Sequence, residues 1–195
     1  MLDTKARRII QPFIGKCAQI FIKAGLSANQ VTILALVIGL IPAIMMVMSL
    51  SSILAVMILW LSGLLDAMDG TIARKTNTMS PFGSVMDVTF DRLVEISLLI
   101  SIGYRYSNEP IVFVILASSI ILSMTIFLTV GAASEKATEK SFYYQPGLAE
   151  RTEGFILFSF MMIFTNHVDV LAMIFSGLIL ITACQRFVEA YKHLK

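Results

Sequence analysis

Charged residues are scarce in this sequence. Of its 195 residues only 14% are charged, whereas 57% are apolar, and the mean hydropathy is +0.83. Soluble domains contain about 25% charged and about 45–50% apolar residues. This shortage of charge excludes an ordinary soluble domain and a disordered chain, and it predicts a polytopic membrane protein.

Cysteine and net charge are also low. The two cysteines, Cys17 and Cys184, lie far apart in apolar stretches and match neither a disulfide framework nor the spacing of a metal site. The 15 basic and 13 acidic residues leave a net charge of only +2, which is too small for a surface that binds nucleic acid. We therefore expect two reduced cysteines and no nucleic acid partner.

Apolar segments of membrane-crossing length dominate the chain. A span needs about 20 residues, and six are expected: 31–50, 53–65 with its continuation through the polar stretch that begins at Asp66, 82–103, 111–133, 155–164 with its preceding turn, and 168–183. The predicted fold is all-α. Residues 26–195 form a bundle of six transmembrane helices and residues 1–25 an interfacial helix, together a single membrane domain of residues 1–195.

Residues 5–24 have the pattern of a helix that lies on the membrane surface. Apolar residues recur at i, i+3, i+4 and i+7 spacing, and most of the lysines and arginines fall on the opposite side. An amphipathic helix with a basic polar face lies in the interface plane of a bilayer. The alternative is an ordinary capping helix that packs on the bundle.

Basic residues are distributed unevenly between the two sides of the predicted bundle. With the N-terminus in the cytoplasm, 13 of the 15 lysines and arginines fall in cytoplasmic segments, Arg92 lies inside the third span, and only Arg105 falls on the far side. Lysine and arginine favour the cytoplasmic side. We therefore expect both termini in the cytoplasm.

Acidic residues gather in the second and third predicted spans. Asp66 and Asp69 are i, i+3 and share one helical face, as do Asp87 and Asp91 at i, i+4. An antiparallel hairpin would bring these four carboxylates together near its cytoplasmic connection. Crowded carboxylates in a low-dielectric site repel one another unless a cation neutralises them, and all-oxygen ligands suit Mg²⁺, Mn²⁺ or Ca²⁺.

These acids also fit three alternative roles. They can cap helix ends or pair with Arg74 and Arg92. They can be ion ligands of a cation transporter, although such proteins often have inverted repeats and we find no repeat here. They can also belong to a membrane prenyltransferase, although the two acidic motifs of those enzymes lie far apart, whereas both pairs here lie within residues 66–91.

The segment from Asp66 to Asp91 resembles the signature of the CDP-alcohol phosphotransferase family, D-x2-D-G-x2-A-R-x8-G-x3-D-x3-D. All the gaps and all eight fixed positions match, namely Asp66, Asp69, Gly70, Ala73, Arg74, Gly83, Asp87 and Asp91. Residues 26–32 resemble the family's first-span start, L-[ST]-P-N-x-x-T, with Ala28 in place of the proline. Because family members also have an interfacial helix and six spans, the resemblance extends over the whole chain.

This resemblance implies an enzyme that transfers a substituted phosphate, here a phosphatidyl group, from a CDP-linked donor such as CDP-diacylglycerol to an alcohol, releasing CMP. It implies a homodimer and two Mg²⁺ or Mn²⁺ ions held by Asp66, Asp69, Asp87 and Asp91. Asp91 would also be the general base for the acceptor hydroxyl. The CDP pocket would be lined by Asn29, Thr32, Asp66, Asp69, Gly70, Ala73, Arg74 and Gly83.

The acceptor alcohol is left open. Residues 149–154 resemble the A-E-R-x-E-R segment of the inositol-phosphate branch of the family, with Gly154 in place of the second arginine. Lys136, Arg151 and Arg186 fall at the cytoplasmic ends of three predicted spans and would form a pocket for a phosphate dianion. Positive-inside topology with snorkelling is the alternative. We expect inositol phosphate or glycerol phosphate, with serine or free inositol as alternatives.

Overall fold

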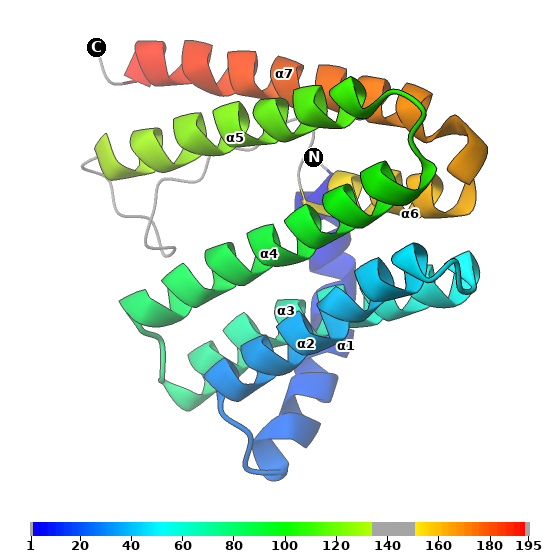
Figure 1. The fold of residues 1–195 in the computed structure, drawn as a ribbon. Coiled ribbons are helices and arrows are strands. Elements are labelled where there is room, and N and C mark those ends of the chain that lie inside the picture. Colours follow the sequence, from blue (N-terminus) through cyan, green and yellow to red (C-terminus); the bar gives the residue numbers. More distant parts are fainter. Residues whose placement is uncertain (1, 134–150, 194–195) are drawn as a thin grey trace. The chain divides into compact units, whose positions relative to one another are not determined.

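The chain is helical throughout the part that the structure describes. The computed structural model describes residues 2–133 and 151–193, and the side chains of residues 11–133 and 152–192. These ranges contain a short 3₁₀ helix, η1 (Thr165–His167), no strand, and seven α-helices (Figure 1): α1 (Leu2–Lys23), α2 (Ala28–Val47), α3 (Ser52–Thr76), α4 (Pro81–Tyr106), α5 (Pro110–Ala133), α6 (Arg151–Ile163) and α7 (Val168–His193). The predicted all-α fold is confirmed.

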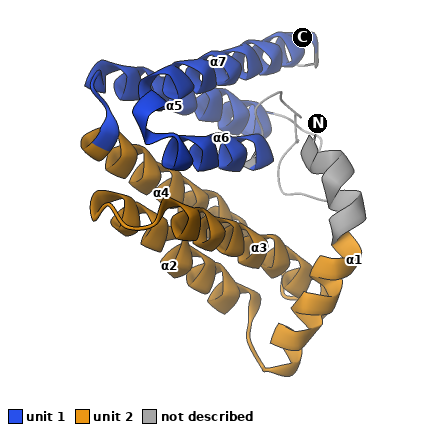
Figure 2. Cartoon of the chain, turned by 90° about the vertical axis from the view of Figure 1, so that its right-hand side faces the viewer, with its two compact units in different colours: residues 1–3, 106–195 blue, residues 4–105 orange. Residues whose placement is uncertain are grey.

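The chain divides into two compact units (Figure 2). Unit 2 is residues 4–105 and contains nearly all of α1 to α4, and unit 1 is residues 106–195 with residues 1–3. Within unit 2, the start of α2, the end of α3 and the start of α4 lie at the same end (Figure 1). The candidate site is built at this end.

Four stretches of the described chain are long and apolar enough to cross a membrane: α2, α3, α5 and residues 165–192. Helix α4 has 26 residues, but Asp87, Asp91, Arg92, Glu95 and Arg105 lower its hydropathy. Helix α6 is shorter, with an apolar stretch of residues 152–163. The structure thus gives four candidate spans, and the count of six stays a prediction.

Local sequence signals set most of the helix boundaries. Ser27 caps α2, and Gln30 completes a capping box, with its backbone N–H donating to Ser27 Oγ and its side chain accepting from the Ser27 N–H. Helices α4 and α5 begin at prolines, which suit the first helical position. Helix α3 continues through Asp66, as expected, and ends where Asn77 adopts a left-handed conformation at φ 56°.

The last predicted span lies inside a longer helix. The span expected at residues 168–183 falls within α7, which continues to His193. Arg186, which follows the expected span, is buried, and its guanidinium lies 5.0 Å from the ring centroid of Phe127 on α5. This cation–π contact attaches the continued part of α7 to α5.

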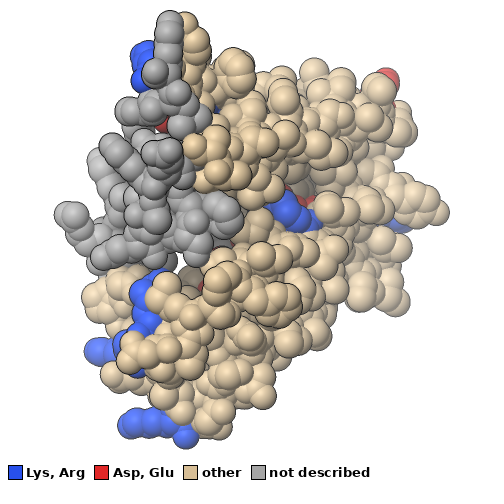
Figure 3. All heavy atoms as spheres, turned by 90° about the vertical axis from the view of Figure 1, so that its left-hand side faces the viewer, with Lys and Arg blue, Asp and Glu red and all other residues tan. Residues whose placement is uncertain are grey.

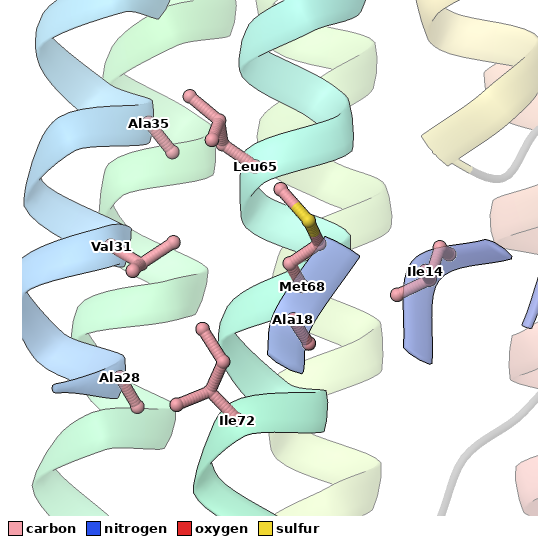
Figure 4. Packing of buried hydrophobic residues seen from close by; sticks show 8 residues of the cluster. All are labelled: Ile14, Ala18, Ala28, Val31, Ala35, Leu65, Met68 and Ile72. Atoms are coloured by element: carbon pink, nitrogen blue, oxygen red, sulfur yellow. The ribbon is translucent and has the colours of Figure 1, made fainter. Parts of the chain in front are cut away.

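A cluster of apolar side chains joins α1, α2 and α3 (Figure 4). Ala28, Val31 and Ala35 of α2 face Leu65, Met68 and Ile72 of α3, and Ile14 and Ala18 of α1 complete the cluster. Most of the α2 members are small, which lets the two helices approach closely, as is common in membrane bundles. Helix α1 therefore packs on the bundle along one side, while its Phe13 and Ile20 remain 56% and 67% exposed.

Gly39 of α2 permits a close approach of three helices in unit 2. A Cβ atom built on Gly39 would lie 2.6 Å from Ser62 Oγ of α3 and 2.6 Å from Val94 Cγ2 of α4. The Ser62 hydroxyl also donates to the carbonyl of Ala35 at 2.8 Å. Gly39 thus sets the spacing of α2 against both α3 and α4.

In unit 1, α5 and α7 lie side by side (Figure 1). Phe158 of α6 packs edge to face on Phe175 of α7, with ring centroids 5.4 Å apart. The connection before α5 is held by Asp169 at the start of α7, which accepts from Ser107 Oγ at 2.5 Å and from the backbone N–H of Asn108 at 3.1 Å. Unit 1 therefore has its own side-chain contacts across helices.

We expect Gly39→Ala to lower the stability of the protein by about 1–3 kcal/mol, because the added methyl group overpacks a tight three-helix contact. Thermal unfolding in detergent measures the change. Gly177→Ala is the matched control, since a Cβ at Gly177 of α7 meets nothing within 4 Å. Equal melting temperatures for Gly39→Ala and the unchanged protein would contradict this role of Gly39 in the packing.

Candidate active site

Three carboxylates converge at one end of unit 2. Asp66 and Asp69 lie one turn apart on α3, and Asp87 comes from the second turn of α4. One oxygen atom of each lies within 4.8 Å of the others. Asp66 and Asp69 are each only 7% exposed, and little of any acidic residue is visible on the face drawn in Figure 3. The chain therefore concentrates negative charge in a largely buried place.

This cluster fits a hard divalent cation. Mg²⁺ and Ca²⁺ bind carboxylate oxygens at about 2.0–2.6 Å, so two oxygens on one ion are separated by at most about twice that distance. The spacing of the three carboxylates in the structure is compatible with this limit. The donor set is entirely oxygen, which favours Mg²⁺, Mn²⁺ or Ca²⁺ over zinc or copper.

Asp91, the fourth predicted ligand, lies one turn further along α4 than Asp87. Its side chain is half-buried, and it is not part of the group whose oxygens lie within 4.8 Å of one another. Arg92, the next residue, forms an ion pair with Glu95, one turn further along α4. The structure thus brings three of the four predicted metal ligands together and leaves Asp91 outside this group, on the same helix as Asp87.

Thr32 connects the acidic cluster to α2. Its hydroxyl donates to Asp69 Oδ2 at 2.6 Å and lies 3.0 Å from the carbonyl oxygen of Ala28. Thr32 and Asp69 are both buried, at 5% and 7% exposed. The sequence placed Thr32 in the pocket for the CDP group, whereas here its hydroxyl contacts a carboxylate of the cluster.

The remaining residues predicted to line the donor pocket lie around the cluster in unit 2. A Cβ on Gly83 would lie 3.7 Å from Asn29 Oδ1, so the starts of α2 and α4 approach each other there. A Cβ on Gly70 would lie 3.5 Å from Arg74 Nη1. Arg74 is exposed, and Ala73 beside it packs partly buried against the apolar cluster. The structure brings Asn29 near Gly83, and Gly70 near Arg74.

Two residues near Arg74 have no counterpart in the sequence analysis. The hydroxyl of Thr71 lies 3.5 Å from the carbonyl oxygen of Ala67 and accepts from Arg74 Nη2 at 3.3 Å and from Gln11 Nε2 of α1 at 3.4 Å. Thr71 stands at i, i+3 from Arg74, so helix spacing alone could have linked that pair. Gln11 is 60 residues away from Thr71, and no local pattern predicts such a contact.

A second bond ties α1 to the end of α3. Lys75 Nζ donates to the backbone carbonyl of Gly15 at 2.7 Å. The Lys75 side chain thus has a partner within the protein, and the bond holds α1 against the helical turn that carries Arg74. The helix expected on the membrane surface is therefore attached directly to the end of unit 2 where the acidic cluster lies.

The predicted acceptor residues fall in the second half of the chain. Arg186 of α7 is buried, donates to Ser123 Oγ of α5 at 3.3 Å, and lies over Phe127. Arg151 is the first residue of α6, but its side chain lies outside the described residues, as does all of Lys136. The acceptor pocket stays a prediction.

We expect Asp66→Asn, Asp69→Asn and Asp87→Asn each to weaken Mn²⁺ binding at least about tenfold, because each removes one charged oxygen ligand from the same cluster. Electron paramagnetic resonance of free and bound Mn²⁺, with purified protein in detergent, measures this directly. Asp169→Asn is the control, since that carboxylate instead binds Ser107 and Asn108. Unchanged Mn²⁺ binding in all three cluster variants would exclude the metal site.

Comparison with known proteins identifies relatives over the whole chain. Residues 26–185 match the family model of the CDP-alcohol phosphatidyltransferases. Archaetidylinositol phosphate synthase of Pyrococcus horikoshii is 30% identical over 196 residues, which cover 100% of this chain and 99% of the relative. Phosphatidylinositol phosphate synthase of Corynebacterium glutamicum is 26% identical over 80% of this chain and 72% of its own.

Solved structures share the fold. The crystal structure of Mycobacterium tuberculosis phosphatidylinositol phosphate synthase (PgsA1) with CDP-DAG bound has a TM-score of 0.74 at 20% identity, covering 91% of this chain and 93% of that one. The same enzyme in complex with manganese and citrate also scores 0.74, at 22% identity, covering 91% and 88%. Since the matched residues 26–185 run through both units, the chain belongs to the CDP-alcohol phosphatidyltransferase family, whose members are phosphotransferases of phospholipid biosynthesis.

Proposed function

We propose that this protein transfers a phosphatidyl group from CDP-diacylglycerol, or a closely related CDP-linked lipid, to a phosphorylated polyol and releases CMP. The observation that carries the proposal is the cluster of Asp66, Asp69 and Asp87, built from the motif that defines the family. A buried group of carboxylates fits a divalent cation, and breaking a pyrophosphate requires that negative charge be neutralised.

Asp66, Asp69 and Asp87 would hold the metal, with Asp91 completing a second position. Mg²⁺ or Mn²⁺ bound there would supply charge neutralisation for the pyrophosphate of the donor. The relative crystallised with manganese is consistent with this choice of ion. Two ions are expected from the family resemblance, and four carboxylates provide enough oxygen ligands for both when water and phosphate oxygens complete the coordination.

The donor would bind where Asn29, Gly70, Arg74 and Gly83 lie. The two glycines have no side chain, so a phosphate or ribose can approach the helix backbone closely. Arg74 is exposed at the end of α3 and can direct its planar guanidinium at a phosphate with two hydrogen bonds. The Thr71 hydroxyl and Gln11 would restrict the orientation of Arg74.

Asp91 would act as the general base. Its carboxylate takes the proton of the acceptor hydroxyl while that oxygen forms the new bond to the lipid-bearing phosphorus. The bond from this phosphorus to the bridging oxygen breaks, and CMP leaves with the electron pair. A positioned carboxylate contributes about 10²–10⁴-fold to such a step. Asp91 suits this role because it is near the metal ligands without being one of the three that converge.

The acceptor would be inositol phosphate or glycerol phosphate, bound by Arg151, Lys136 and Arg186. Two of the relatives are named for making inositol phosphate lipids, which favours inositol phosphate. Arg186 supports the pocket from this chain's own structure, since a buried arginine held by Ser123 and Phe127 is pre-organised to meet an anion.

The membrane would contain six spans, with α1 in the interface and both termini in the cytoplasm of a cell with a bacterial-type inner membrane. Helix α4 would be a span in spite of its charges, because its acidic residues serve the site. With the site at the cytoplasmic edge, the CDP group can stay in water while the acyl chains stay in lipid. A homodimer is expected from the family resemblance.

We expect purified protein to release CMP from CDP-diacylglycerol only when Mg²⁺ or Mn²⁺ and an acceptor are present. Asp91→Ala should lower kcat by at least about 10²-fold while Mn²⁺ binding is largely retained. A screen of inositol phosphate, glycerol phosphate, inositol and serine identifies the acceptor. CMP release without metal would refute the proposed chemistry, and near-normal release by Asp91→Ala would refute its role as base.

Arg151→Ala should raise the acceptor KM sharply and leave the donor KM nearly unchanged, because it removes binding on one side of the reaction only. Steady-state kinetics with each substrate varied in turn separates the two constants. Arg105→Ala is the control, a cation whose Nε contacts Ser49 Oγ in unit 2. If serine or free inositol is the good substrate and Arg151→Ala is silent, the acceptor is not a phosphorylated alcohol.

A further inference from the structure

The hydroxyl of Thr32 makes a short hydrogen bond to the acidic cluster. The distance from Thr32 Oγ1 to Asp69 Oδ2 is 2.6 Å. The carbonyl oxygen of Ala28 lies further away, at 3.0 Å. Because a hydroxyl has one proton, we assign that proton to the shorter of these two contacts, the one to Asp69.

The packing around this bond leaves the Thr32 side chain little freedom. Thr32 is β-branched and therefore has few rotamers in a helix, and it stands on α2 directly after Val31, which is fully buried against α3. Thr32 and Asp69 come from different helices and are both buried. The hydroxyl thus reaches Asp69 from a fixed position on a neighbouring helix.

A carboxylate can accept this bond and still bind a cation. An ionised carboxylate has two oxygens with about four lone-pair sites, so the bond from Thr32 occupies one site and fixes the plane of the group. Residues that hydrogen-bond to metal ligands in this way orient them, and their loss typically lowers metal affinity about 10–100-fold.

We propose that Thr32 is a positioning residue that orients Asp69 for the metal, instead of a residue that binds the CDP group. The proposal deepens the proposed function and rests on its metal site. It also changes what the sequence suggested, since the family resemblance placed Thr32 among the residues of the donor pocket. The one proton of the Thr32 hydroxyl is donated to Asp69, so the hydroxyl cannot also donate a hydrogen bond to the CDP group.

The test compares three variants in Mn²⁺ binding measured by electron paramagnetic resonance, without donor. Thr32→Val removes the hydroxyl at nearly constant shape, and Thr32→Ser keeps it. Ser62→Ala is the matched control, because Ser62 is also buried and also makes a bond between α3 and α2, to the carbonyl of Ala35. Gel filtration and thermal unfolding establish that each variant is folded, and Thr32→Ala replaces Thr32→Val if the latter is not.

We expect Thr32→Val to weaken Mn²⁺ binding about 10–100-fold, Thr32→Ser to bind Mn²⁺ within a few-fold of the unchanged protein, and Ser62→Ala to lose stability only. At saturating metal, the donor KM of Thr32→Val should be unchanged. The proposal is overturned if Thr32→Val binds Mn²⁺ normally, or if Ser62→Ala weakens binding equally. A raised donor KM with normal Mn²⁺ binding would instead return Thr32 to the donor pocket.

Failure of the Thr32 proposal can be distinguished from failure of the proposed function, because different measurements test them. CMP release by the unchanged protein tests the reaction, whereas Mn²⁺ binding by the variants tests Thr32. If the unchanged protein binds Mn²⁺ but releases no CMP from CDP-diacylglycerol, the proposed substrates are wrong and the comparison of variants still decides the role of Thr32. If it binds no Mn²⁺, both proposals are wrong.

Discussion

The close packing of α2 against α3 is the interaction on which the candidate site depends. Small residues of α2 face larger ones of α3, and Gly39 leaves no room for even a methyl group against Ser62 and Val94. At this separation the Thr32 hydroxyl can reach a carboxylate on the next helix. If α2 and α3 lay further apart, the same apolar residues would still face each other, but the Thr32 hydroxyl would no longer reach Asp69.

The same packing creates an electrostatic constraint. Asp66 and Asp69 are nearly excluded from solvent and lie close to Asp87. Moving ionised carboxylates out of water is unfavourable unless opposite charge compensates for the lost hydration. Such a cluster lowers the stability of the fold unless a cation is bound. Its burial therefore favours a role in cation binding over a role as helix caps.

The sequence predicts those parts of the structure that depend on local periodicity. Apolar runs give the helices, and i, i+3 spacing puts Asp66 and Asp69 on one face. It does not predict the bond from Thr32 to Asp69, 37 residues apart, or that from Gln11 to Thr71, 60 residues apart. Those contacts depend on how helices pack, as do the contacts of the buried Arg186 on α7 with Ser123 and Phe127 on α5.

The two units divide the proposed chemistry. All the residues expected to hold the metal and the donor lie in unit 2, between Asn29 and Asp91, whereas Arg186 and the other expected acceptor residues belong to unit 1. The family model extends over both, so in the proposed function the donor would be bound by the first half of the chain and the acceptor by residues of the second half. Under this proposal, a change in the second half, such as Gly154 in place of the second arginine of the inositol-phosphate segment, would alter the choice of acceptor and leave the carboxylates proposed to act on the donor as they are.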